Sequence, residues 1–185
     1  MAGRTVYYAA MSLDGYIAEP EEKLDWLTKF EPAGSALGED DGGMGGYDEF
    51  FAGIGALTMG SKTYEFLVRE GVWPYGDMPA WVYTSRELPP IEKATGLRFT
   101  SGDVAAEHAE QVEAAAGKDL WVLGGGDLAS QYIDAGLLDL LRVTVVPTIL
   151  GAGLPLFAGP VPPMKLLGTT PFDNGMVELS YEVAR

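Results

Sequence analysis

Three adjacent glycines, Gly124 to Gly126, carry the clearest chemical signal in this sequence. An apolar run, Leu120 to Leu123, precedes them, and the amphipathic segment Leu128 to Leu138 follows them. That order predicts a strand, a turn and the first turn of a helix, whose free backbone N–H groups attract anions such as phosphate. The alternative is a tight turn that uses glycine only because its backbone needs positive φ. The spacing does not match the GxGxxG fingerprint of a Rossmann dinucleotide site.

Two further polar turns follow predicted strands. Gly60-Ser61-Lys62-Thr63 comes after the apolar run Ala56 to Met59, and Thr84-Ser85-Arg86 comes after Trp81 to Tyr83. Ligands of α/β sheets bind at the carboxyl ends of the strands, so the three turns are expected to line one groove. Their hydroxyls, amides and cations suit the phosphates of an extended dinucleotide. Each turn alone is equally compatible with a solvated loop and a helix cap.

The elements that must position these turns alternate along the chain. Apolar runs predict strands at 6–11, 56–59, 81–83, 97–100, 120–123, 140–146, 165–167 and 177–183, and amphipathic segments predict helices at 47–54, 64–70, 105–116 and 128–138. This alternation indicates a single α/β domain spanning 1–185, with a mostly parallel sheet between two helical layers. The last strands follow one another without a helix, so we expect antiparallel strands at one edge.

Composition excludes several classes of function. The 185 residues include no cysteine and one histidine, His108, which we expect at the surface; thiolate or histidine metal sites and a Ser-His-Asp triad are therefore improbable. A net charge of -15 with 12 Lys and Arg argues against nucleic acid as a partner. No apolar run approaches the roughly 20 residues of a membrane helix and no secretory signal is visible, so a soluble, cytoplasmic protein is expected.

Five segments together resemble a known family. They follow the order of the dihydrofolate reductase-like superfamily, and the closer resemblance is to the reductase domain of the bifunctional riboflavin biosynthesis deaminase-reductase. The segments are AAMSLDGYIA (9–18), TMGSKTYE (58–65), VYTSREL (82–88), LWVLGGGDLASQYI (120–133) and VPTILGAGLPLF (146–157). The resemblance spans nearly the whole chain and implies the three-layer αβα fold of that superfamily, with a mixed sheet.

The resemblance also implies an NADPH-dependent reductase that works on a small heterocyclic or ribosylamino-pyrimidine substrate, and a homodimer. The nicotinamide is expected near Ala9, Ala10, Gly15 and Ile17. The remaining cofactor contacts are expected from Gly60, Ser61, Lys62 and Thr63 at phosphates, from Thr84, Ser85 and Arg86 at the 2′-phosphate side, and from Gly124, Gly125, Gly126, Asp127 and Leu128 at the pyrophosphate. Asp127 departs from the pattern, because an NADP-binding relative could carry a cation there.

The substrate side is less specific. Asp48 and Glu49 are candidate proton donors by their position before the second strand, and Glu31 is a candidate by its distance from Trp26. Lys23, Lys29 and Arg69 are the cations that could meet a substrate phosphate. Aromatic residues could form walls for a flat heterocycle or belong to the core: Trp26, Phe50, Phe51, Trp73, Tyr75 and Trp81.

Two other functions stay open at this point. One is dihydrofolate reductase activity proper. The other is a non-catalytic nucleotide-binding or oligomerisation module, which the unplaced acid and the sparse cations suggest.

Overall fold

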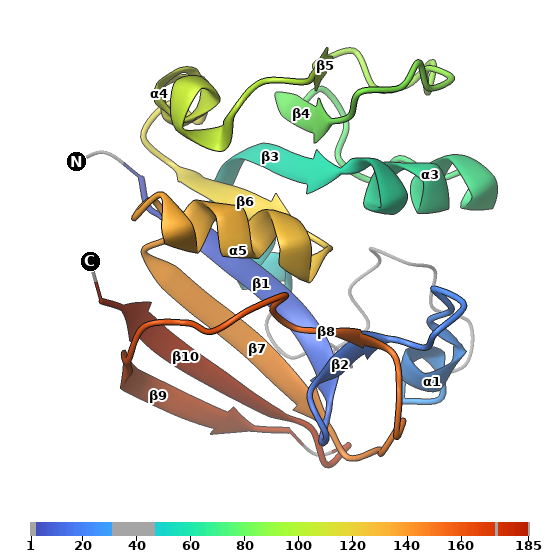
Figure 1. Cartoon of the computed structure of the whole chain (residues 1–185), viewed down its shortest axis with the longest axis vertical. Coiled ribbons are helices and arrows are strands. Elements are labelled where there is room, and N and C mark those ends of the chain that lie inside the picture. The colour runs from blue at the N-terminus through green and yellow to red at the C-terminus, as the bar shows by residue number, and fades with distance from the viewer. Residues whose placement is uncertain (1–2, 31–46, 173, 185) are drawn as a thin grey trace.

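A computed structural model describes residues 3–30, 47–172 and 174–184. Its centre is an eight-stranded sheet with the order β5-β4-β3-β6-β1-β7-β10-β9, shown in Figure 1. The strands from β5 to β7 pair in parallel, whereas β10 is antiparallel to both β7 and β9. The expected mixed sheet with an antiparallel edge is therefore confirmed.

The described residues form ten strands and five α-helices. The strands are β1 (Thr5–Ser12), β2 (Tyr16–Ala18), β3 (Ile54–Gly60), β4 (Ala80–Tyr83), β5 (Leu97–Thr100), β6 (Asp119–Leu123), β7 (Leu140–Val146), β8 (Leu154–Pro155), β9 (Met164–Pro171) and β10 (Val177–Val183). The helices are α1 (Asp25–Thr28), α2 (Tyr47–Ala52), α3 (Ser61–Glu70), α4 (Val104–Ala114) and α5 (Gly126–Asp134). Within the described ranges, no helix is long and apolar enough to cross a membrane.

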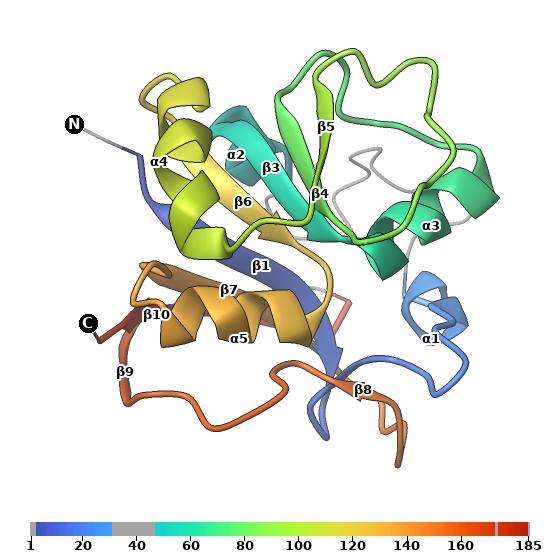
Figure 2. The ribbon, with the colours of Figure 1, turned by 45° about the horizontal axis from the view of Figure 1, so that its top comes forward.

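Two hydrophobic cores cover opposite faces of the sheet, because successive side chains of a strand point to opposite sides. Tyr8 and Trp121 join one core with α2 and α3, whereas Tyr7 and Val122 join the other with α4 and α5. Figure 2 shows α4 and α5 on the near face and α2 behind the sheet. This arrangement is the predicted three-layer αβα fold.

Two details differ from the sequence expectations. β2 and β8 form a separate two-stranded sheet, which the polar and glycine-rich composition of both segments concealed. His108 is half-buried and its Nε2 lies 2.8 Å from the Thr5 hydroxyl oxygen, so the expectation of a purely surface residue is wrong. The packing of α4 against the sheet brings this ring to β1, and helix periodicity alone did not reveal it.

Candidate cofactor and substrate site

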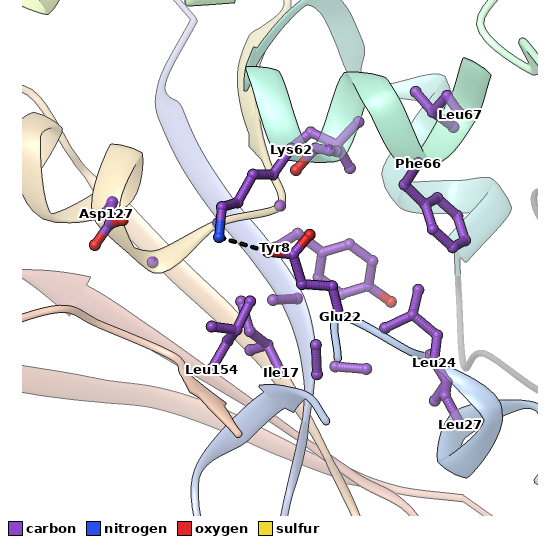
Figure 3. A pocket seen from close by; sticks show the side chains of 18 of the residues that line it. Tyr8, Ile17, Glu22, Leu24, Leu27, Lys62, Phe66, Leu67, Asp127 and Leu154 are labelled. Atoms are coloured by element: carbon purple, nitrogen blue, oxygen red, sulfur yellow. Dashed lines mark hydrogen bonds and ion pairs between the residues drawn. The ribbon is translucent and has the colours of Figure 1, made fainter. Parts of the chain in front are cut away.

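A cavity of about 350 Å³ opens at the carboxyl ends of β1, β3 and β6. Figure 3 shows side chains from both sides of it. One side, named here the glycine half, comprises Ala9, Ala10, Lys62, Thr63 and the turn from Gly124 to Asp127. The other side, the aromatic half, comprises Tyr8, Leu24, Leu27, Tyr47, Phe66, Leu67, Pro74, Tyr75 and Trp121.

The three glycines of the triplet differ in what an added side chain would meet. Gly124 has φ +92°, and a Cβ there would lie 2.0 Å from the Thr63 hydroxyl oxygen. A Cβ on Gly126 would lie 2.6 Å from the Leu156 carbonyl oxygen, because the turn packs against the backbone around β8. A Cβ on Gly125, in contrast, would meet open space. Two glycines therefore serve the fold, and Gly125 leaves backbone exposed to the cavity.

Tyr7 fixes this turn from behind. Its fully buried hydroxyl donates to the Gly124 carbonyl at 2.9 Å and also lies 3.2 Å from the Leu156 carbonyl oxygen. Burial raises the pKa of this phenol far above its usual value, so the group stays a neutral donor. β1, the glycine turn and the loop after β8 are thus joined at one atom.

The helices α3 and α5 both begin at the cavity. Gly60 and Gly125 are their N-cap residues, and among the described residues no side chain caps either helix start. The first N–H groups of a helix carry partial positive charge and need acceptors. Two such starts beside one cavity form an environment suited to an anion with several phosphate groups.

Lys62 adds a full positive charge at this place. Its Nζ donates to the Glu22 carboxylate at 2.5 Å, across the cavity as Figure 3 shows. This bond to Glu22 raises the pKa of the lysine, and Asp127 contributes less. Glu22 holds a left-handed backbone, φ +60°, which costs a non-glycine residue about 1 kcal/mol or more. The Glu22 carboxylate is therefore the present partner of the Lys62 cation.

Asp14 holds the loop between β1 and β2, which carries Gly15 and leads into Ile17 of β2. Its carboxylate accepts from the Ser12 hydroxyl at 2.7 Å and from the backbone N–H groups of Leu150 and Gly151 at 3.1 and 2.7 Å. The bond from Ser12 is the main cause that lowers the pKa of Asp14. Because the pKa of Asp14 is lowered in the folded protein, the hydrogen bonds to its carboxylate stabilise the loop at pH values above the ordinary pKa of an aspartate. This stabilisation is lost as pH falls through the lowered pKa of the folded state.

The aromatic half disfavours charge. Tyr8 and Tyr75 are 5% and 7% exposed, and burial raises the pKa of both phenols. Burial, followed by the neighbouring Tyr8 and Asp48, raises the pKa of Tyr47 to about 12. All three hydroxyls therefore stay neutral at pH 7. The rings pack edge-on or tilted against Trp121, which leaves an apolar wall with a few neutral hydroxyls.

The structure brings most of the predicted cofactor residues together. The cavity is lined by Ala9, Ala10, Ile17, Lys62, Thr63, Gly124, Gly125, Gly126 and Asp127. Gly15, Gly60, Ser61, Thr84, Ser85, Arg86 and Leu128 are not among its lining residues. Leu128 is 4% exposed in the core on the α4 and α5 side. Arg86 donates to Glu65 at 2.9 Å, next to the start of α3.

Asp48 and Glu49 do not reach the cavity. Both are exposed on α2, whereas Tyr47 lines the cavity and Phe50 packs into the core. Helix geometry explains the difference, since residues three apart share a face and the two between them point elsewhere. The carboxylates of the described chain that do line the cavity are Glu22 and Asp127. Glu31 lies outside the described residues.

The cations that were expected to meet a substrate phosphate also differ in whether they reach the cavity. Arg69 lines the cavity, but Lys23 and Lys29 do not. Lys23 is paired with Glu21, two residues away. Of the six aromatic residues proposed as walls, Tyr75 lines the cavity and the other five do not.

Sequence reasoning missed more than half of the cavity lining, including Tyr8, Glu22, Phe66 and Trp121. Tyr8 and Trp121 sit inside apolar strands, where alternation shows that they share a face but not that an open cavity adjoins it. Phe66 lies one helical turn after Lys62 and could have been found from that spacing. Glu22 lies in a polar loop without periodicity, so no local signal marks it.

Comparisons with known proteins support this fold. The model of the family described as RibD C-terminal domain matches residues 57–178. The chain is 32% identical to an uncharacterized protein, YwjB, from Bacillus subtilis (strain 168), over 98% of both chains. A putative riboflavin biosynthesis protein from Shewanella sp. PV-4 superposes with a TM-score of 0.80 at 22% identity, covering 98% of this chain and 99% of that one.

A more distant structure shows the wider fold. Dihydrofolate reductase from Enterococcus faecalis, solved in complex with NADP(H), superposes with a TM-score of 0.64 at 17% identity, covering 100% of this chain and 99% of that one. At this identity the similarity concerns the fold alone. Together with the family match over residues 57–178, which is more than half of the sequence, these findings show that the chain belongs to the RibD C-terminal domain family.

Proposed function

We propose that this protein is an NADPH-dependent reductase of a small heterocyclic substrate, of the type that reduces 5-amino-6-(5-phosphoribosylamino)uracil in riboflavin biosynthesis. One observation carries the proposal: two uncapped helix starts, the open backbone of Gly125 and the Lys62 cation meet at one cavity. In a member of the RibD C-terminal domain family, a nicotinamide dinucleotide is the ligand that such an arrangement suits.

The residues present fit this cofactor. Gly125 would let a pyrophosphate approach the backbone, and Lys62 and Thr63 would bind phosphate oxygens at the start of α3. Ala9 and Ala10, with their small side chains, would allow a flat nicotinamide ring to lie against β1. Asp14 would hold the loop with Gly15, and with it Ile17 at the centre of β2, over that ring. When bound, the reduced nicotinamide would supply a hydride to a polarised double bond of the substrate.

The preference for NADPH over NADH rests on two cations. Lys62 lies in the cavity, and Arg86 with Thr84 and Ser85 follows β4, the neighbour of β3 in the sheet. Both cations now pair with carboxylates, Glu22 and Glu65, which a 2′-phosphate or a pyrophosphate would have to displace. The Asp127 carboxylate repels an anion at the glycine turn. The affinity for NADPH would therefore depend on how readily its phosphates displace Glu22 from Lys62 and Glu65 from Arg86.

We also propose that the protein works as a cytoplasmic homodimer. The support is the resemblance to riboflavin-pathway reductases, together with the exposed edge strand β9, where Leu166 and Leu167 are 52% and 50% exposed. An edge strand with exposed apolar side chains is a ready surface for pairing with a second chain. Sedimentation of the purified protein at micromolar concentration tests the dimer directly.

Cofactor binding provides the decisive test. Titration with NADPH should raise the melting temperature of the wild-type protein and follow mass action, with a smaller effect from NADH. Oxidation of NADPH is then followed with the ribosylamino-pyrimidine and with dihydrofolate, which separates the riboflavin-type activity from dihydrofolate reductase activity. If neither NADPH nor NADH changes the melting temperature, the reductase proposal is wrong. Binding without oxidation of either substrate would favour a nucleotide-binding module.

A further inference from the structure

The aromatic half of the cavity contains little that could bind a phosphate group. Among the described residues that line the cavity, Arg69 is the one cation outside the glycine half. Its side chain is 58% exposed, lies 3.4 Å from the Glu70 carboxylate and stacks over the Phe66 ring with 5.2 Å to the centroid. Arg69 is therefore a largely exposed residue at the rim, paired with its neighbour in sequence.

The residues between α1 and α2 that the structure does not describe also contain no cation. Residues 31–46 contain neither lysine nor arginine, and their acidic residues are Glu31, Glu39, Asp40 and Asp41.

The walls themselves disfavour an anion. Leu24, just before α1, Leu27 in α1 and Phe66 in α3 point towards the cavity in Figure 3. Tyr8, Tyr47 and Tyr75 show the effect on charge, because burial raises the pKa of each phenol and so opposes its ionised form. A phosphate dianion placed there would meet the same desolvation cost, and Arg69 at the rim is the one cation of the described lining outside the glycine half that could offset it.

We propose that the substrate of this protein is a flat, uncharged aromatic or heteroaromatic molecule without a phosphate group. The inference rests on the proposed reductase function, because it names the substrate class for the second half of the same cavity. Recognition would come from stacking on the aromatic rings and from hydrogen bonds to neutral hydroxyls such as those of Tyr8 and Tyr47. The chain would then differ in substrate from a reductase that acts on a phosphoribosyl compound.

Two matched pairs of probes test this substrate class: riboflavin with its 5′-phosphate, and uridine with its 5′-phosphate. Binding to the full-length protein is measured by calorimetry or tryptophan fluorescence, with and without saturating NADP⁺. We expect the neutral member of at least one pair to bind at least about tenfold more tightly than its phosphate. A tighter phosphate in either pair, or no binding of any probe, would overturn the inference.

Two variants sharpen the result. Arg69→Gln should change the affinity for riboflavin and for its phosphate less than about twofold. A loss of tenfold or more for the phosphate alone would instead make Arg69 a phosphate ligand and contradict the proposal. Leu24→Lys places a cation in the aromatic half and should improve the affinity for the phosphate relative to riboflavin by about tenfold.

The two proposals can fail separately. If NADP⁺ and NADPH do not bind but riboflavin or uridine still binds more tightly than its phosphate, the reductase function is wrong, and only the preference of the cavity for uncharged ligands stands. If NADPH binds and the phosphorylated probes are preferred, the reductase function stands and the inference fails.

Discussion

Three of the helices that pack on this sheet, α3, α4 and α5, differ at their starts in a way that separates function from folding. At the start of α4, the Asp103 carboxylate accepts from the Ala105 backbone N–H at 2.8 Å, so the helix satisfies its own donors. At the starts of α3 and α5, glycine stands at the N-cap and no side chain of the described residues takes that role. The uncapped starts adjoin the cavity, whereas Val104, at the start of α4, belongs to a core. A helix start that lacks a cap leaves its donors available to a ligand.

The largest expected effect separates two neighbouring glycines at the start of α5. Gly126→Ala should lower the free energy of unfolding by about 1–3 kcal/mol, since its Cβ meets the backbone around Leu156. Gly125→Ala should stay within about 0.5 kcal/mol of wild type, because its Cβ meets open space. The methyl group should nevertheless weaken NADPH binding. Urea denaturation and NADPH titration of both variants measure the contrast; equal stabilities would show that the packing at Gly126 is not limiting.

Removal of the cation beside the start of α3 comes next. Lys62→Met should weaken NADPH binding roughly tenfold, because one charge-assisted bond to phosphate is lost. Lys93→Met is the matched control, since Lys93 is exposed and does not line the cavity. Isothermal titration at two salt concentrations gives both affinities. An equal loss in both variants would mean that only the overall charge matters.

The capped start of α4 should affect folding stability and not cofactor binding. Asp103→Ala should cost about 1 kcal/mol of folding stability, which is typical of a lost N-cap, and leave NADPH affinity unchanged. Thermal denaturation with and without NADPH separates the two quantities. A loss of cofactor affinity without a loss of stability would contradict the division between capped and uncapped starts.

The smallest expected effect concerns the Glu22 carboxylate, which forms an ion pair with Lys62. Glu22→Gln removes a negative charge from the cavity and should tighten NADPH binding about two- to fivefold, as expected for a largely exposed ion pair. Glu21→Gln, whose side chain pairs with Lys23 instead, should leave the affinity unchanged. If Glu22→Gln leaves the affinity for NADPH unchanged but abolishes turnover, Glu22 acts on the substrate and does not compete with the phosphate.

Much of the glycine half could be predicted because its signals are local. A strand, a glycine turn and a helix that follow one another in sequence remain neighbours in space, so Lys62, Thr63 and the triplet were found together. The aromatic half is assembled from β1, α1 and the residue before it, α2, α3 and the loop that follows it, and β6, segments far apart in the sequence. No local pattern distinguishes an aromatic side chain that lines a cavity from one that fills the core.

The pairing of charges also escaped prediction. Lys62 and Arg86 were expected to bind phosphate groups, but in the structure their side chains form ion pairs with Glu22 and Glu65. Glu22 comes within 2.5 Å of Lys62 although 40 residues separate the two in sequence. Such a contact depends on how the loop after β2 folds back, and composition gives no information on that path.

By itself, the sequence determined the alternation of strands and helices, the mixed sheet, and the glycine turn at the start of a helix. These features follow from hydrophobic periodicity and from backbone freedom, which act over a few residues. Only the tertiary structure decided that Gly125 is the open glycine, that Asp48 and Glu49 point away from the cavity, and that Glu22 faces Lys62. Those outcomes depend on packing between distant segments, because the direction of a side chain has meaning only once its neighbours are in place.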